Sequence, residues 1–192
     1  MDNKFMLPCG VDMENTEGLK NAYETHPDGG FEAVVSAEKL PALITELAGL
    51  IKEPVFFFLE LPDENSADDS GWTTYYLDNC TSEVISVLIK EYGSLLAGDG
   101  VCRFGFGGNE SGGEIYVKLY KVISVYPADE EMLRGTLKAF GKFGMEQTSP
   151  LVTPWELISE ENPAVCVRAE EDGISLFDLP EMLKNAGMYR AE

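Results

Sequence analysis

The sequence predicts an α+β fold, in which a mixed, mainly antiparallel sheet has helices packed against it. Runs rich in β-branched and aromatic residues alternate with runs whose apolar residues recur at helical spacing. One glycine-rich connection between two strand-like runs is too short for a parallel crossover, which needs a dozen or more residues. With 44% hydrophobic residues, the 192-residue chain can bury one core. We therefore expect a single domain over residues 1–192, with residues 1–30 as a peripheral N-terminal segment.

The first part of the chain predicts a helix, a strand and a second helix. Residues 15–25 have the composition of a frayed helix, which Gly18 interrupts and which Pro27 and Gly29 end. The run FEAVV at 31–35 alternates as a strand does. The next helix should present one apolar face to the core, formed by Leu40, Leu43, Ile44, Leu47 and Ile51.

The middle of the chain predicts most of the sheet. PVFFFLELP is apolar without alternation, which is typical of a central strand covered on both faces, here at 55–61. Thr81 or Ser82 should cap a helix. Further strands are expected at 73–77, 101–106 and 114–126. The last two should be antiparallel neighbours, because only GGNESGG separates them.

The last third predicts helices with clear end signals. One helix should carry the acids of 129–131 near its positive N-terminal end and stop at Gly144. In TPWE, Thr153 should cap a short helix while Glu156 reaches back to the cap amide. Two strands around the turn EDG and a terminal helix closed by Gly187 complete the expected order.

The stretch FGFGGNESGG resembles a phosphate-binding loop in its glycine content. A dinucleotide loop needs G-x-G-x-x-G between a strand and a helix. Gly105 and Gly107 fill two positions, but Glu110 fills the third and a strand follows. We therefore expect a hairpin whose glycines accept positive φ, and we expect it to bind neither nucleotide nor metal.

Other catalytic and metal-binding patterns are incomplete. Asp63 and Asn65 could start a calcium loop, but Ala67 stands at the fifth ligand position, which leaves at most a weak surface site. The one histidine, His26, lies in a predicted exposed turn, without the G-x-S-x-G elbow of a hydrolase or a second imidazole for zinc.

The remaining polar chemistry consists of thiols and carboxylates. The cysteines are far apart in sequence and are expected to be free, buried hydrophobes, namely Cys9, Cys80, Cys102 and Cys166. No catalytic residue, metal ligand or cofactor is predicted. An acid pair would form an active site only if burial raised one pKa above that of its partner, which a sequence does not reveal.

The charge balance limits the class of partner. The chain has 34 acids and 14 bases, a formal charge of −20, which repels phosphate backbones and anionic lipids. It also lacks a signal-like N-terminus and a long apolar run. We expect a cytoplasmic protein that binds neither nucleic acid nor membrane; its oligomeric state is left open.

One acidic stretch is predicted to bind a basic protein. Residues 53–89 contain no lysine or arginine, and aromatic residues of the kind that anchor interfaces occur among their acids. The predicted partner-binding residues are Asp63, Glu64, Asp68, Asp69, Trp72, Tyr75 and Tyr76. The alternative is a solvated acidic surface beside ordinary strand aromatics.

Several segments together carry a family resemblance: FFFLELP, YYLDN, FGFGGNESGGEIYVKLYKV, LVTPWELISEENP and GMYRAE. Over residues 55–192 the chain resembles small uncharacterised acidic cytoplasmic proteins of Gram-positive bacteria, some of which are of the toxin-immunity type. The resemblance implies a non-enzymatic protein that binds and neutralises a partner. It supplies no catalytic residue.

Two functions therefore follow as hypotheses. The first is a non-enzymatic protein-binding domain, of which an immunity-type inhibitor of a basic partner is one form. The second is a small carboxylate-dependent hydrolase or small-ligand-binding domain. A deep pocket lined by close, buried acids would favour the second, and an acidic face without such a pocket would favour the first.

Overall fold

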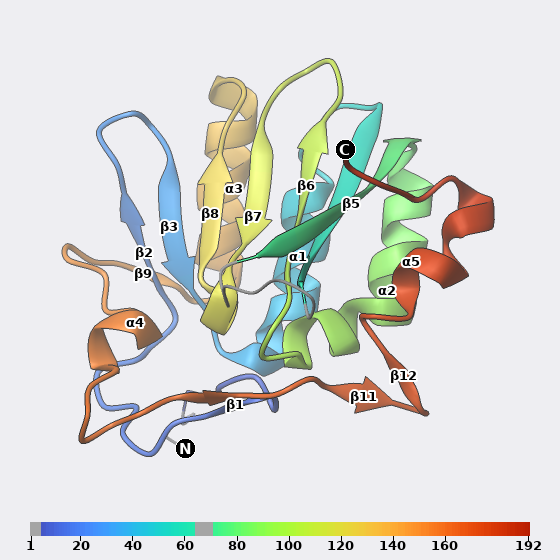
Figure 1. Ribbon diagram of the computed structural model, residues 1–192. Helices are drawn as coiled ribbons and strands as arrows, with labels where there is room; N and C mark the ends of the chain where they lie inside the picture. Colours follow the sequence, from blue (N-terminus) through green and yellow to red (C-terminus); the bar gives the residue numbers. More distant parts are fainter. Residues whose placement is uncertain (1–4, 64–70) are drawn as a thin grey trace.

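A computed structural model describes residues 5–63 and 71–192 of the chain. Within these ranges a large sheet has the strand order β13-β5-β4-β6-β7-β8-β3-β2-β9 (Figure 1). Its strands are β2 (Ala22–Thr25), β3 (Phe31–Val34), β4 (Val55–Pro62), β5 (Trp72–Cys80), β6 (Arg103–Gly108), β7 (Glu114–Val117), β8 (Ile123–Tyr126), β9 (Glu146–Gln147) and β13 (Tyr189–Arg190). The pair β2–β9 is parallel and the other neighbours are antiparallel. The predicted α+β class, with a mixed and mainly antiparallel sheet, is confirmed.

Three helices cover one face of this sheet: α1 (Leu40–Ala48), α2 (Ser82–Gly98) and α3 (Glu130–Lys142). Figure 1 shows α1 and α3 behind the strands. Alternate strand residues and the helices share one core, in which Phe57, Phe104, Phe106 and Phe140 are fully buried. The five residues of the predicted apolar stripe in and after α1 are all buried in this core, as expected.

The predicted ends of the two longer helices are also confirmed. The Thr81 hydroxyl caps α2 by accepting a hydrogen bond from the Val84 amide at 3.4 Å. Asp129 caps α3 through the amide of Met132 at 2.9 Å. Gly144 follows α3 with φ of 68°, the left-handed conformation in which a helix often stops.

Residues 15–25 are not the helix that their composition predicts. Gly18 has φ of 91°, and the second part of the stretch is strand β2. β2 pairs with β3 through a tight connection, in which the His26 amide donates to the Gly30 carbonyl at 2.8 Å. The prediction failed because a strand of four residues is too short to show a periodicity of its own. Pairing with a neighbouring strand determines its secondary structure.

The strand predicted at 114–126 is two strands. β7 ends at Val117, the turn η2 (Leu119–Lys121) follows, and β8 runs back beside β7. Tyr120 and Lys121 have φ of 56° and 58°, which reverses the chain as glycine or asparagine would. The Lys121 side chain is buried and donates to the Cys102 carbonyl at 3.0 Å. Such tertiary contacts hold a turn whose residue types do not predict one.

β4 is a central strand, as predicted, but helices cover only one of its faces. Val55, Phe57, Leu59 and Leu61 point into the helix-covered core and are buried. The alternate residues lie on the other face, where Phe56 and Glu60 are only partly buried. The continuous apolar run therefore has two causes, a helix-covered core on one side and packing among aromatic rings on the other.

The C-terminal quarter follows the predicted order with shorter strands. Thr153 and Glu156 form the expected capping box of α4 (Pro154–Leu157). The predicted strand pair around EDG is the small hairpin of β11 (Glu170–Glu171) and β12 (Ile174–Ser175), whereas β10 (Val165–Cys166) pairs with β1 (Val11–Asp12). The chain then forms η3 (Lys184–Ala186) after α5 (Leu179–Met182), and η1 (Ala37–Lys39) precedes α1. Gly187 ends the terminal helical region with φ of 104°.

The cysteines are free, as expected, but they are not all buried. Cys80 and Cys102 are buried and Cys166 is partly buried, whereas Cys9 is exposed. His26 is exposed in its turn. No helix of the described ranges combines the length and the apolar character that crossing a bilayer requires.

Candidate functional site: the helix-free face of the sheet

The face of the sheet opposite the helices, which we call the helix-free face, carries a row of aromatic rings. Its row runs across neighbouring strands from Tyr189 through Tyr76 and Phe58 to Tyr116, with ring centroids 6.1, 6.2 and 5.5 Å apart. Phe56 lies beside the row, 5.9 Å from Tyr76. Contacting rings at these separations stabilise each other; Phe58 is buried within the row, whereas Tyr189 at its end is 48% exposed.

Two glycines of β6 make room for these rings. A Cβ atom on Gly105 would lie 2.4 Å from the ring of Phe58 and 2.3 Å from the carbonyl oxygen of Ile115. A Cβ on Gly107 would lie 2.3 Å from the ring of Phe56. The rings of β4 therefore lie over the bare backbone of β6. The alternation of phenylalanine and glycine in RFGFGG serves both faces, because Phe104 and Phe106 point into the core.

A polar network extends from one end of the aromatic row. The Tyr116 hydroxyl donates to Glu60 Oε2 at 2.7 Å. Arg103 Nε lies 2.8 Å from the same oxygen, as an ion pair whose N–H is not aligned for a hydrogen bond. The guanidinium carbon of Arg103 lies 3.6 Å from the ring centre of Trp72. Arg103 is thus held between a carboxylate and an aromatic face, the arrangement that suits a guanidinium best.

Three further acids of this face have partners within the chain. Glu32 pairs with Lys118 Nζ at 2.5 Å. Asp78 accepts from the Tyr189 hydroxyl at 2.5 Å. Glu24 accepts from the Ser149 hydroxyl at 2.6 Å and from the Leu151 amide at 3.0 Å, which holds its pKa below the usual range.

Glu114 differs from these acids. It opens β7, directly opposite Gly107 on one side and Tyr126 on the other. No hydrogen bond or ion pair joins its carboxylate to another part of the chain that the structure describes. Burial, and to a lesser extent the charge of Glu60, raise the pKa of Glu114. Burial and the hydrogen bond to Glu60 also raise the pKa of Tyr116.

The predicted partner-binding residues are divided by the fold. Trp72 and Tyr76 lie on the helix-free face, where they contact Arg103 and the aromatic row. Tyr75 points to the other face and packs against the main core. Asp63 is partly buried just after β4. Glu64, Asp68 and Asp69 lie outside the described residues.

The acids of the base-free stretch do not form one surface. Glu60 and Asp78 lie on the helix-free face. Glu53 instead accepts from the Ser82 amide at 2.6 Å at the start of α2, which lowers the pKa of its carboxyl group. Glu83 is exposed in the first turn of the same helix. Two of these acids therefore match the positive end of a helix.

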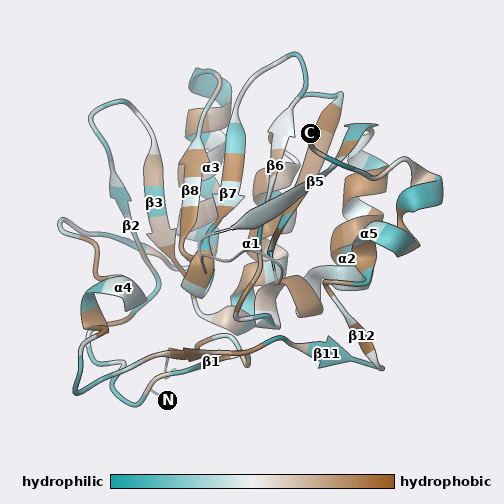
Figure 2. Cartoon of the chain, in the orientation of Figure 1, coloured by the Kyte–Doolittle hydropathy of each residue, from teal (hydrophilic) through white to brown (hydrophobic). Residues whose placement is uncertain are grey.

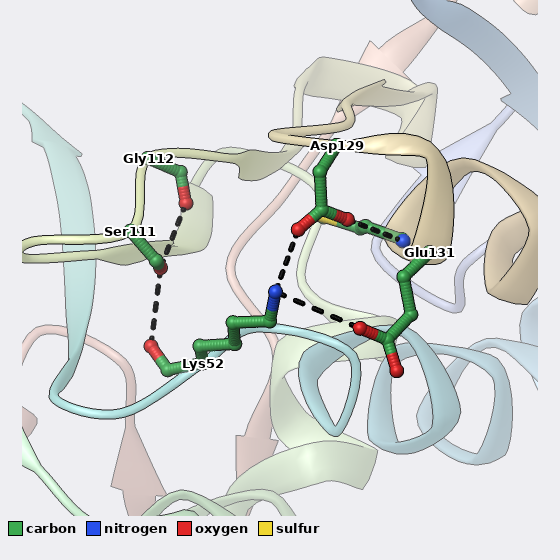
Figure 3. A network of polar contacts seen from close by, with 6 residues as sticks. Lys52, Ser111, Gly112, Asp129 and Glu131 are labelled. Atoms are coloured by element: carbon green, nitrogen blue, oxygen red, sulfur yellow. Dashed lines mark hydrogen bonds and ion pairs between the residues drawn. The ribbon is translucent and has the colours of Figure 1, made fainter.

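The glycine-rich segment between β6 and β7 is a hairpin, as predicted, with Gly112 and Gly113 at φ of 70° and 75°. The Ser111 hydroxyl donates to the Lys52 carbonyl at 3.2 Å, and Lys52 Nζ pairs with Asp129 at 2.7 Å (Figure 3). The loop therefore lies near the N-terminus of α3, whose positive end is already matched by side-chain carboxylates. Its failure to bind nucleotide stays a prediction.

One surface pocket lies apart from these acids. It holds about 570 Å³ between α1 and α2, and Pro41, Val87 and Lys90 are among its lining residues, which include no carboxylate. In the described ranges no three histidine, cysteine or acidic residues are grouped so that they could hold a metal ion.

Sequence reasoning missed Phe56, Tyr116, Tyr126 and Glu114 as members of this face. A signal for Tyr116 was present, because β7 alternates and places Glu114 and Tyr116 on one side and Ile115 and Val117 on the other. The pairing of β7 with β8 was not predicted, because residues 114–126 have the sequence pattern of one continuous strand.

Comparisons of the chain with protein-family models, with curated proteins and with solved structures found no match.

Proposed function

We propose that this chain is a non-enzymatic protein-binding domain whose helix-free face binds a basic protein. The observation that carries the proposal is the aromatic row from Tyr189 to Tyr116, on a face that no helix of the described residues covers. Tyrosine and tryptophan are enriched at interface hot spots, where they bury much area at low entropic cost.

The charge of the face supports a basic partner. Among the described residues, the bases Arg103 and Lys118 of this face are each paired with an acid of the same face. Glu114, Asp78 and Glu24 add negative charge without a basic residue paired to them among the described residues. With −20 overall, the chain should attract a basic protein over the Debye length and accelerate encounter.

The acids before β5 belong to the same proposal. Asp63, Glu64, Asp68 and Asp69 precede Trp72, which contacts Arg103 on the face. Replacing the four acids by their amides should lower the association rate and flatten its dependence on salt. The resemblance to toxin-immunity proteins extends the proposal to an inhibitor that neutralises its basic partner.

A matched pair of substitutions tests the proposal. Tyr126 on the helix-free face and Trp155 on α4 are 49% and 50% exposed. A partner captured at low salt would be identified by mass spectrometry, purified, and measured by surface plasmon resonance. Tyr126→Ala should raise the dissociation rate at least about fivefold, while Trp155→Ala should leave it unchanged. Equal effects of the two variants, or no effect of Tyr126→Ala together with Tyr76→Ala, would refute the assigned face.

A carboxylate-dependent hydrolase is the second candidate, and one observation favours it. Burial, and to a lesser extent the charge of Glu60, raises the pKa of Glu114, as a general acid near a second carboxylate would require. A panel of ester, phosphoester and glycoside substrates tests this function. It would gain support only from turnover that both Glu114→Gln and Glu60→Gln abolish, and that Glu110→Gln in the exposed loop leaves intact.

A further inference from the structure

The helix-free face contains a complete binding site for a guanidinium group, and the chain's own Arg103 occupies it. We call a site of this kind, an aromatic ring beside a carboxylate, a seat. Arg103 lies with its guanidinium carbon 3.6 Å from the ring centre of Trp72 and with Nε 2.8 Å from Glu60. The aromatic ring takes the flat side of the guanidinium and the carboxylate takes its charge. This arrangement shows what chemistry suits a cation on this surface.

The same components recur around Glu114, without a base. Glu114 lies directly opposite Gly107, and the ring of Phe56 occupies the space above that glycine. Phe56 therefore lies next to Glu114 with no side chain between them. On the other side Glu114 opposes Tyr126, which is half exposed. Directly opposed residues in a sheet have Cβ atoms about 5 Å apart, within reach of one bound side chain.

Every other acid of the face has a partner from the chain, as described above, whereas the carboxylate of Glu114 meets none among the described residues. Glu114 is partly buried, so solvent screens a cation placed beside its carboxylate less than it would at a fully exposed site. An acid that remains unsatisfied in the free protein is what a partner's base would satisfy.

We propose that Glu114, Phe56 and Tyr126 form a seat for an arginine side chain of the partner protein. The proposal rests on the proposed function, because it names the residue that the basic partner presents. Arginine fits better than lysine, since its planar guanidinium can stack on Phe56 while it pairs with both carboxylate oxygens of Glu114.

The seat can be tested without the partner, by titrating the full chain with three short peptides and following backbone amides by NMR. Each is a pentapeptide with capped ends, with two glycines on either side of a central arginine, lysine or citrulline. Citrulline is neutral and similar in shape to arginine. The arginine peptide should bind in the millimolar range and shift the amides of Gly107, Glu114 and Tyr126 in a saturable manner. The lysine peptide should bind more weakly, and the citrulline peptide should cause no saturable shift.

Substitutions separate the seat from general charge attraction. Glu114→Gln should weaken the arginine peptide roughly tenfold, because charge-assisted pairing is lost while shape is retained. Glu110→Gln removes an exposed acid four positions earlier and should leave binding unchanged. Equal binding of the arginine and citrulline peptides, equal effects of the two variants, or no saturable shift at all would overturn the seat.

The outcomes also separate the seat from the proposed function. If the peptides fail but Tyr126→Ala still weakens a protein partner, the face binds protein and the arginine seat is wrong. If the arginine peptide binds through Glu114 but no protein depends on Tyr126 or Tyr76, the seat stands and the protein-binding function is wrong.

Discussion

The two faces of the sheet use alternate residues of the same strands and stabilise them differently. In β4, Phe57 and Leu59 are fully buried under helices, whereas Phe56 and Phe58 pack on neighbouring rings and on the bare backbone of β6. Figure 2 shows hydrophobic residues along the central strands and hydrophilic ones at the hairpin tips above them. Similar aromatic residues therefore pack under helices on one face and against one another on the helix-free face, and hydropathy alone does not separate the two roles.

The largest expected difference between the faces is in stability. Phe57→Ala should lower the free energy of unfolding by about 4 kcal/mol, because it removes a fully buried ring and leaves a cavity. Phe56→Ala, one position earlier, should cost only about 1–2 kcal/mol, since its partly exposed ring has less area to lose. Urea unfolding followed by tryptophan fluorescence measures both. Similar costs would mean that the helix-free face is as thoroughly packed as the core.

The glycines of β6 extend this comparison to the backbone. Gly105→Ala should destabilise the fold by about 2–3 kcal/mol, because its Cβ would meet the Ile115 carbonyl oxygen, which belongs to the adjacent strand and cannot rotate away. Gly107→Ala should cost about 1 kcal/mol or less, since the atoms in its way belong to the movable ring of Phe56. Thermal unfolding of the two variants compares them. A larger loss for Gly107→Ala would contradict the placement of the two rings.

A buried charge on the core side gives a pH test. The Lys121 side chain is buried near the ring of Phe104. Burial lowers its pKa below 10.5, although interactions with Asp99, Cys102, Cys166 and Cys9 act in the opposite direction and raise it. Between the lowered pKa and 10.5 the unfolded chain binds more protons, so stability contributed by this group rises with pH. In urea titrations at increasing alkaline pH, the wild-type protein should gain stability relative to Lys121→Met, by at most about 1.4 kcal/mol per pH unit. A constant difference would show that Lys121 titrates normally.

Sequence patterns predicted α1, α2 and α3 and much of the core side of the sheet because those features depend on local signals. The apolar stripe of α1, the cap Thr81, the acids of 129–131 near the start of α3 and the stop at Gly144 are each readable within a few residues. The helix-free face was predicted only through Trp72 and Tyr76. Glu114 and Phe56 meet across Gly107 by strand pairing between positions far apart in the chain, which no local pattern specifies.

The smallest expected effect on stability separates two acids of the helix-free face. Glu114 has a pKa raised above 4.5 by burial and by Glu60, so the folded state binds more protons between 4.5 and that raised pKa. Stability contributed by this group therefore falls as pH rises through that interval, and the ionised carboxylate is a cost at neutral pH. Glu114→Gln should remove the cost and stabilise the fold by roughly 0.5 kcal/mol, a small gain because solvent screens a partly exposed group.

Glu32→Gln provides the control of opposite sign. Glu32 is paired with Lys118 at 2.5 Å, so its replacement should cost up to about 1 kcal/mol, as for other partly exposed ion pairs. Urea unfolding at pH 7 should therefore rank Glu114→Gln above the wild-type protein and Glu32→Gln below it. If Glu114→Gln raises the stability of the free protein and also weakens binding, then Glu114 lowers stability in order to bind, as is expected of a binding residue. If both variants lose stability, Glu114 has a structural partner, and the arginine seat loses its main support.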